Sequence, residues 1–252
     1  VLDYHINSMR FWLNLGVAGF RFDAVGVLIE NGAGRLENQV ENLAIMQTLR
    51  AGVADYSGVY IVCEAPGQFR AMASPNACGY AFNFAAGHAV LDSVKSGQVT
   101  TSLHNELNAV NHDQMPLILA NHDAFAGIRI FDQLSGDEAE YKVAAATYLL
   151  ASANPFTYYG EEIGMAGGLN LNGDQALRTP MSWTNNTLHA GFSNRTPFRA
   201  LSRNVQTHNV EQAVQQSGSL LEFYNALYTL RQAQPILSQG NLTVLSHAAD
   251  AV

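Results

Sequence analysis

Basic residues are scarce in this sequence. Lys and Arg number 13 against 21 Asp and Glu, which gives a formal net charge of −8, and only 13% of the residues are charged. The chain has no cluster of basic residues that could follow a phosphate backbone. We therefore expect no nucleic acid partner.

Cysteine and long apolar runs are scarce too. Cys63 and Cys78 are the only cysteines, too few for a disulfide scaffold and without the spacing of a metal site, so they leave the redox compartment open. The most apolar stretch, residues 143–159, is interrupted by polar residues and a proline, which argues against a membrane span. No signal peptide is visible at the start, where the chain opens without Met in a helical pattern.

Hydrophobic periodicity predicts alternating helices and short strands. Helices are predicted at residues 2–15, about 36–53, 137–152 and 217–232. Strands are predicted at residues 19–23, 58–64, 80–85, 115–121 and 154–160. The last helix is expected to be capped by Ser217 or Ser219, and residues 161–216, rich in Gly, Asn and Thr, to form long loops. This alternation is typical of a parallel α/β architecture.

Five predicted strands are fewer than the eight of a closed barrel. We therefore expect an α/β fold in which residues 1–240 form the C-terminal portion, about strands 4 to 8, of a (β/α)8 barrel. About three βα units would precede Val1. Residues 241–252 are expected to begin a β-rich C-terminal domain that is cut short.

Three carboxylates follow directly after strand-like runs: Asp23 after GFRF, Glu64 after VYIVC and Asp123 after LILANH. The C-terminal ends of parallel strands form one face, so we expect these acids to converge in one cleft. Converging carboxylates suit glycoside hydrolysis, in which one attacks the anomeric carbon and another protonates the leaving oxygen. Arg21 shares a strand face with Asp23 and should keep it ionised, whereas the apolar run before Glu64 favours its protonated form.

Each acid also has a plainer interpretation. Asp23 could cap the next helix, Glu64 could form a salt bridge at a strand end, and Asp123 could be a turn residue. The tripeptide NHD occurs twice, at 111–113 and at 121–123. Because the first copy follows a helical pattern and the second follows a strand, we assign function to His122 and Asp123 and treat the first copy as a loop.

These motifs resemble those of the α-amylase family, glycoside hydrolase family 13. GFRFDAV is similar to the family's nucleophile motif, VYIVCEAPG to its acid/base motif and LILANHD to its third-acid motif, in the same order and at comparable spacings. NPFTYYGEEIGM is similar to the family's eighth-strand region, and RTPMSW to a loop of its bacterial amylase and α-glucosidase branches. SLLEFYNALYTLRQAQPIL is similar to its last barrel helix.

The resemblance implies retaining cleavage of α-1,4-glucosidic bonds in starch or maltooligosaccharides. Asp23 would be the nucleophile, Glu64 the acid/base and Asp123 the stabiliser of the transition state. Arg21 would hold the nucleophile, and His122 would hydrogen-bond sugar hydroxyls.

Further substrate contacts are expected outside the triad. Phe125 and Arg129 are expected either to line the cleft or to pack within their loop. Trp183, in a polar loop, is expected either to be a platform on which a sugar stacks or to anchor the loop. Trp12 is expected in the core. Of the adjacent Glu161 and Glu162, we expect one to serve structure by bonding loop amides.

The early Asn-His motif of the family, whose Asn is often a calcium ligand, has no counterpart here. The resemblance therefore implies no cofactor for the chemistry and no metal ligand within this chain, and it places the ligands of any structural calcium ion upstream. The expected partner is an α-glucan or maltooligosaccharide. The expected location is secreted or periplasmic.

Other functions use the same residues. An α-glucosidase or a glucan transglycosylase shares the triad, because water and a sugar hydroxyl are alternative acceptors for one glycosyl-enzyme intermediate. A non-catalytic scaffold with an amylase-like domain is a third alternative, and the intact Asp23, Glu64 and Asp123 argue against it.

Overall fold

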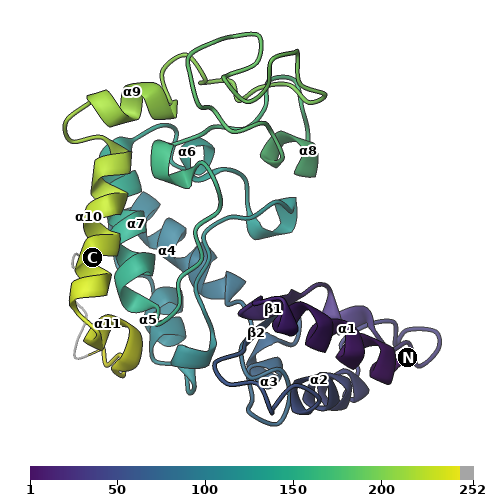
Figure 1. Cartoon of the computed structure of the whole chain (residues 1–252). Helices are drawn as coiled ribbons and strands as arrows, with labels where there is room; N and C mark the ends of the chain where they lie inside the picture. The colour runs from purple at the N-terminus through teal and green to yellow at the C-terminus, as the bar shows by residue number, and fades with distance from the viewer. Residues whose placement is uncertain (245–252) are drawn as a thin grey trace. The chain divides into compact units, whose positions relative to one another are not determined.

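The computed structural model describes residues 1–244, which divide into two compact units. The first unit comprises Val1–Asn83 and Val110–Pro116, and the second comprises Phe84–Ala109 and the chain from Leu117 onward. Figure 1 colours the chain from its N-terminus to its C-terminus. The predicted start of a β-rich domain at residues 241–252 falls mostly outside the described residues.

The first unit is built on two parallel strands, β1 (Gly19–Phe22) and β2 (Tyr60–Cys63), labelled in Figure 1. Its helices are α1 (Leu2–Asn14), α2 (Glu41–Ala51) and α3 (Phe69–Met72), with 3-10 turns η1 (Val25–Val27) and η2 (His112–Gln114). Helices α1 and α2 pack against each other. The first two predicted strands and the first predicted helix are thus confirmed.

Helix α2 begins later than predicted. Leu36 and Val40, which fall within the predicted helix, are exposed and precede α2, whereas Met46, within α2, is fully buried. Asn38, between Leu36 and Val40, adopts the left-handed conformation with φ of 56°, so a right-handed helix cannot run through residues 36–40.

Strands β1 and β2 approach each other so closely at Gly19 that no side chain fits. A Cβ atom at Gly19 would lie 1.9 Å from the carbonyl oxygen of Tyr60, the residue with which Gly19 pairs. Only glycine allows this approach. Beyond it, Ile61, Val62 and Cys63 are buried and anchor β2 in the unit.

The third, fourth and fifth predicted strands form only isolated bridges, and Phe84 and Ala85 of the third belong to the helix that follows, so their prediction as full strands is wrong. Ala81 bridges to Cys63, and Ile118 bridges to Phe156, each in parallel orientation. Pro116 and Pro155 lie in or beside these segments and offer no N–H group, which limits the hydrogen bonds that a ladder needs.

Cys63 and Cys78 form a disulfide that joins residues 15 apart in sequence. Both cysteines are fully buried. The bridge links the end of β2 to the segment that returns beside it, where Cys63 N–H donates to Tyr80 O and Phe82 N–H donates to Cys63 O. The sequence left the state of these cysteines open, and the structure resolves it.

The second unit is mainly helical. Its helices are α4 (Phe84–Ser96), α5 (Thr101–Leu107), α6 (Ile130–Gln133), α7 (Glu138–Ala151), α8 (Asp174–Leu177), α9 (Val210–Gln215), α10 (Leu220–Ala233) and α11 (Ile236–Gln239), with 3-10 turns η3 (Ala124–Ala126) and η4 (Glu161–Ile163). Helix α4 packs against α5 and α7, and α7 packs against α10, as Figure 1 shows. Their shared core contains Leu91, Leu119, Tyr148, Leu149 and Tyr224.

Helix ends in this unit are set by local chemistry. The Asp137 side chain caps α7 by accepting from the N–H groups of Ala139 and Glu140, and Ser219 caps α10, as one of the two predicted alternatives. At the other end of α7, Arg231 of α10 donates to the carbonyls of Leu149, Ser152 and Ala153. A cation there also complements the helix dipole.

Trp12 is not a core residue. It is 49% exposed, because α1 turns Met9 and Leu13, four residues apart, into the unit and leaves Trp12 toward solvent. The prediction that Trp12 lies in the core is therefore wrong.

Loss of the disulfide should destabilise the protein. We expect the double variant Cys63→Ser/Cys78→Ser to lose about 3 kcal/mol of unfolding free energy, because the bridge closes a loop of about 15 residues in the unfolded chain. Chemical denaturation of the variant and of the oxidised and reduced wild type measures this loss. Equal stability of all three samples would contradict it.

Gly87 in α4 should not tolerate a side chain. In an open helix interior Ala is better than Gly, but a Cβ here would lie 2.1 Å from the carbonyl oxygen of Ile118. We expect Gly87→Ala to lower the unfolding free energy by about 1–3 kcal/mol. Lys95→Ala on the exposed end of the same helix is the control and should stay near wild type in the same denaturation experiment.

Candidate active site

Asp23 and Glu64 are positioned by the pairing of β1 with β2. Phe22 pairs with Cys63 at the last position of the two strands, so the residues that follow, Asp23 and Glu64, emerge at the same end. The backbone continues this register, since Glu64 N–H donates to Phe22 O at 2.8 Å and Val25 N–H donates to Glu64 O at 3.1 Å. The predicted placement of these two acids at strand ends is confirmed.

Arg21 links the two carboxylates. Its Nη1 lies 2.7 Å from Asp23 Oδ1, and its Nη2 pairs with Glu64 Oε2. The Asp23 side chain is 71% exposed, whereas that of Glu64 is 8% exposed. Glu64 is thus buried, as expected. Its surroundings are not purely apolar, because its carboxylate pairs with the guanidinium that also holds Asp23.

The chain turns sharply after Asp23. Ala24 adopts a left-handed conformation with φ of 48°, which is uncommon for a residue with a side chain. The turn leads to Gly26, whose carbonyl accepts from Asn38 N–H and from the Asn42 side chain. Gln68, four residues beyond Glu64, donates to Asn38 O, so one polar network ties together the loops that follow β1 and β2.

Asp123 lies in the second unit at the centre of a separate charged group. Its Oδ1 is 2.5 Å from Arg178 Nη2, and its Oδ2 is 3.1 Å from His122 Nε2. Arg178 also pairs with Asp174 and donates through Nε to His122 O. Asp174 completes the ring by accepting from Ala124 N–H at 2.8 Å.

The sequence did not assign a role to Arg178 or Asp174. Asp174 and Arg178 lie four residues apart, in and just after the short helix α8, and pair as helical neighbours do. That spacing was a readable signal, but the contact with Asp123 joins positions more than fifty residues apart and depends on the fold.

The predicted site residues therefore fall into two groups. Arg21, Asp23 and Glu64 meet in the first unit, and His122 and Asp123 meet in the second. The meeting of all three acids in one cleft stays a prediction. The other NHD copy forms the 3-10 turn η2 in the first unit.

The remaining predicted contacts have different environments. Phe125 is 48% exposed and packs edge-on against Phe84. Arg129 is 1% exposed, its two terminal nitrogens donate to the carbonyls of Tyr159 and Leu177, and its guanidinium lies over tyrosine rings. The structure gives Arg129 a structural role in place of the predicted substrate contact, because it is buried and its two terminal nitrogens are bonded inside the unit.

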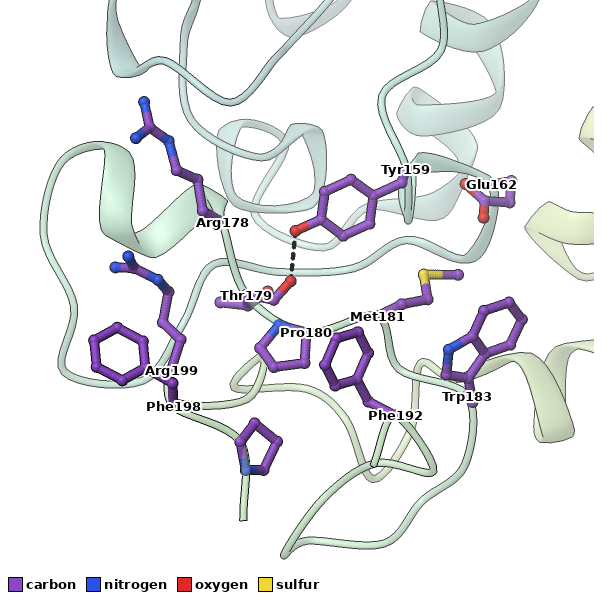
Figure 2. A pocket seen from close by; sticks show the side chains of 11 residues that line it. Tyr159, Glu162, Arg178, Thr179, Pro180, Met181, Trp183, Phe192, Phe198 and Arg199 are labelled. Carbon is purple, nitrogen blue, oxygen red and sulfur yellow. Dashed lines mark hydrogen bonds between the residues drawn. The ribbon is translucent and has the colours of Figure 1, made fainter. Parts of the chain in front are cut away.

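Trp183 lies on the wall of an open cavity in the second unit, shown in Figure 2. The cavity is lined by Tyr159, Glu162, Arg178, Thr179, Pro180, Met181, Trp183, Phe192, Pro197, Phe198 and Arg199. Trp183 is 48% exposed. Its exposure and position are compatible with the predicted stacking role, which stays a prediction.

Glu161 and Glu162, adjacent in sequence, have different surroundings. Glu161 is 1% exposed; it accepts a hydrogen bond from Tyr148 OH, and its backbone carbonyl accepts one from Tyr141 OH. Burial is the main cause that raises the pKa of Glu161 well above its ordinary value, and it also raises the pKa of Glu162. Glu162 instead faces the cavity of Figure 2.

Within residues 1–244, His, Cys, Asp and Glu form no group of three or more with the arrangement of a metal site. None of the helices in that same range combines the length and the apolar character needed to cross a bilayer. A structural calcium ion with ligands upstream stays a prediction.

Comparison with known proteins shows which proteins this chain resembles. A family model described as the α-amylase catalytic domain matches residues 1–240. The chain is 28% identical to the trehalose synthase/amylase TreS of Mycobacterium tuberculosis over 95% of this chain and 48% of that protein. The crystal structure of α-amylase from H. orenii has a TM-score of 0.77 and 27% identity, with 99% of this chain and 50% of that chain covered. The Bacillus licheniformis trehalose-6-phosphate hydrolase structure has a TM-score of 0.74 at 20% identity, with 96% of this chain and 54% of that chain covered.

These likenesses confirm the predicted fold class, a portion of a (β/α)8 barrel. The chain spans about half the length of the relative and of both structures.

The buried Glu161 should make stability depend on pH. The pKa of Glu161 is higher in the folded state than in the unfolded state. As the pH rises above the ordinary pKa of glutamate, Glu161 therefore ionises in the unfolded state first. The free energy of unfolding then falls by about 1.4 kcal/mol per pH unit until the pH reaches the folded pKa. Glu161→Gln should match wild type near pH 4 and be more stable near pH 7. Denaturation curves across this range measure the difference.

Glu211→Gln, at an exposed position in α9, is the control and should follow the wild-type curve. If Glu161→Gln and wild type stay parallel from pH 4 to 7, Glu161 does not carry the expected shift.

Proposed function

Because the chain belongs to the α-amylase family, we propose that the protein containing it is a retaining glycoside hydrolase that cleaves α-1,4-glucosidic bonds in starch or maltooligosaccharides. The observation that carries this proposal is the Arg21 bridge between Asp23 and Glu64 at neighbouring strand ends. Two carboxylates close to one another on adjacent strands are the arrangement that retaining glycosidases use.

In the proposed mechanism Asp23 attacks the anomeric carbon while Glu64 donates a proton to the glycosidic oxygen. The bond to the leaving sugar breaks and a glycosyl ester forms on Asp23. Glu64 then takes a proton from water, which attacks the anomeric carbon and releases Asp23 with retention of configuration. Asp123 stabilises the positive charge that develops on the sugar ring, and His122 hydrogen-bonds sugar hydroxyls.

Arg21 has two tasks in this mechanism. It fixes the orientation of the Asp23 carboxylate before attack, and it forms an ion pair with Glu64 until substrate binds. Proton transfer requires the Glu64 oxygen to face the glycosidic oxygen, so substrate binding has to replace the contact between Arg21 and Glu64. Catalytic contacts commonly rearrange in this way when a substrate binds.

A second candidate is a glucan transglycosylase or an α-glucosidase. The likeness to a protein named trehalose synthase/amylase over 95% of this chain favours the transglycosylase. In that reaction the same glycosyl-enzyme intermediate passes its glucosyl group to a sugar hydroxyl. We further propose a secreted or periplasmic location, which the buried disulfide between Cys63 and Cys78 supports, since such bridges persist in oxidising compartments.

Removal of the acids tests the proposal. In the full-length protein acting on maltotriose, we expect Glu64→Gln to lower kcat by about 10²–10⁴-fold and Asp23→Asn by at least as much. Asp123→Asn should lower kcat by about 10²–10³-fold, as loss of one transition-state contact does. Asp113→Asn, in the other NHD copy, is the matched control and should keep wild-type kcat.

Product analysis by NMR completes the experiment. Retention predicts that the newly formed reducing end, on the sugar that water releases from Asp23, is first seen as the α-anomer. A new reducing end that first appears as the β-anomer, or equal loss of activity in Asp113→Asn and Asp123→Asn, would refute the assigned roles. Glucosyl transfer to maltotriose in place of hydrolysis would select the second candidate.

A further inference from the structure

The disulfide between Cys63 and Cys78 lies directly beside a candidate catalytic residue. Cys63 is the last residue of β2, and Glu64 follows it in the chain. Side chains alternate along a strand, so Cys63 points to the face of β2 opposite to that of Glu64. The bridge therefore fixes the end of β2 from one face, while Arg21 pairs with Glu64 on the other face.

The disulfide reinforces the weaker side of β2. On the side of β1, the ladder continues past the strand, because Glu64 N–H donates to Phe22 O at 2.8 Å. On the other side, residues 80–82 form an isolated bridge with Cys63 in place of a full strand. That bridge has two hydrogen bonds, from Cys63 N–H to the carbonyl of residue 80 and from the N–H of residue 82 to Cys63 O. A pair of hydrogen bonds without a longer ladder opens easily, so the covalent bond is what keeps this segment beside β2.

The segment that carries Cys78 is made of turns. The N–H groups of Cys78 and Gly79 both donate to Met72 O, at 3.1 and 3.3 Å. Ala77 N–H donates to Ser74 O at 2.9 Å. These local bonds fix the shape of the segment but not its distance from β2. The distance is set by the bridge to Cys63.

A cavity within the first unit reaches Cys78. Its volume is about 360 Å³, and its wall includes Ile61, Cys78 and Tyr80. This volume is in the range of sites that admit small molecules. Ile61 and Cys63 share one face of β2, so the cavity lies on the face away from Glu64. Cys63 and Cys78 are 0% and 1% exposed, and the cavity gives a small reagent a route to the sulfur of Cys78. We call it the bridge cavity.

Arg50 places a positive charge in the bridge cavity. It lines the cavity, and its Nη1 donates to Pro75 O at 2.5 Å. A Cβ atom at Gly79, the residue after Cys78, would lie 3.1 Å from Arg50 Cζ. The guanidinium is thus close to the backbone that carries the sulfur. A cation in this position stabilises a thiolate, which is the form of a thiol that attacks a disulfide.

We propose that the Cys63–Cys78 bridge positions Glu64 and that a dithiol which enters the bridge cavity abolishes this positioning by opening the bridge. The proposal rests on the proposed function for the role of Glu64. Cys63 and Cys78 are positioning residues, because they act on Glu64 through the end of β2. In the reduced protein the fold is kept, but the Glu64 carboxyl group is no longer fixed where it can protonate the leaving sugar.

The opening of the bridge is a thiol–disulfide exchange. One thiolate of the dithiol attacks Sγ of Cys78; the S–S bond breaks, and its electron pair goes to Sγ of Cys63, which takes a proton from water. The second thiolate of the reagent then attacks the reagent sulfur of the mixed disulfide, and Cys78 leaves as a thiolate near Arg50. The bridge is reduced by two electrons, and the dithiol is oxidised to a disulfide.

Access to the bridge is tested in the native, full-length protein by alkylation and mass spectrometry. We expect dithiothreitol to make both Cys63 and Cys78 available to the alkylating reagent without denaturant. Arg50→Met should slow this reaction about 3- to 10-fold, because the attacking thiolate loses a nearby cation. Arg35→Met removes the same charge from an exposed position of the same unit and should react as wild type.

The kinetic test compares two substrates that differ in their need for a proton. The ratio kcat/KM reports formation of the glycosyl-enzyme intermediate. We expect reduction to lower kcat/KM for maltotriose about 10-fold or more, since a misplaced general acid protonates the leaving sugar poorly. For dinitrophenyl α-maltoside, whose leaving group departs without a proton, kcat/KM should stay within about 2-fold. A general loss of structure would lower both values equally.

The cysteine variant and reoxidation are the controls. Cys63→Ser/Cys78→Ser should show the kinetics of reduced wild type and should not respond to dithiothreitol. Reoxidation of reduced wild type should restore kcat/KM for maltotriose, and circular dichroism of the reduced protein should match that of the oxidised protein.

Hydrogen exchange separates this proposal from the proposed function, because it needs no substrate. Reduction should speed exchange of the Cys63 and Glu64 amides and leave the amides of α7 unchanged. If these two amides respond but oxidised wild type cleaves neither substrate, the hydrolase proposal fails and the effect of the bridge on β2 stands. If oxidised wild type cleaves maltotriose and reduction changes neither exchange nor kcat/KM, the reverse holds.

Four other outcomes would overturn the positioning proposal. They are a native bridge that resists dithiothreitol, equal losses of kcat/KM with the two substrates, wild-type kcat/KM for maltotriose in Cys63→Ser/Cys78→Ser, and loss of the circular dichroism signal on reduction.

Discussion

The parallel register of β1 against β2 is the constraint on which the candidate site depends. Gly19 lets the strands start in close contact, and the pairing of Phe22 with Cys63 ends them together. Asp23 and Glu64 then leave the strands at the same level, within reach of one guanidinium. A slip of one residue would turn the side chains of one strand to the opposite face and separate the two acids. The relative position of the two acids is thus set by the backbone hydrogen bonds between the strands.

The sequence predicted those features that depend on interactions between residues close together in the chain. The period-two pattern of GFRFDAV placed Arg21 beside Asp23, the apolar pattern predicted the helix that begins near residue 137, and Ser219 was one of the two predicted caps of α10. These features depend on neighbours within a few residues. The contact of Arg21 with Glu64 was not foreseen, because it requires the strand register and joins residues 43 apart.

Long-range features escaped sequence reasoning for the same reason. Arg178 reaches Asp123 across 55 positions, and nothing in RTPMSW says which carboxylate it meets. The cysteines showed no pairing pattern, since their bridge depends on the return of the chain beside β2. Three predicted strands shrank to bridges because an apolar run predicts burial more reliably than it predicts a complete hydrogen-bond ladder. Arg129 looked available for substrate, yet its partners are carbonyls from distant loops.

Burial alone does not identify the candidate catalytic groups of this protein. Glu161 is among its most buried carboxylates and is enclosed by tyrosines, whereas Asp23 is largely exposed. The distinguishing feature of Asp23 is a charged partner that orients it at the end of a strand. Glu161 lacks an open side from which a substrate could approach, so its place is in the architecture.

The hydrogen bonds from Arg231 to the end of α7 limit how far the protein can be shortened at its C-terminal side. Its guanidinium is the hydrogen-bond donor for carbonyls at the point where α7 stops and the chain turns toward Pro155. A trimmed version that stops before residue 231 would leave those oxygens buried without a donor and would strip α10 from the core at Tyr224 and Leu227. Expression boundaries should therefore retain the whole of α10, even where interest lies only in the acids more than a hundred positions upstream.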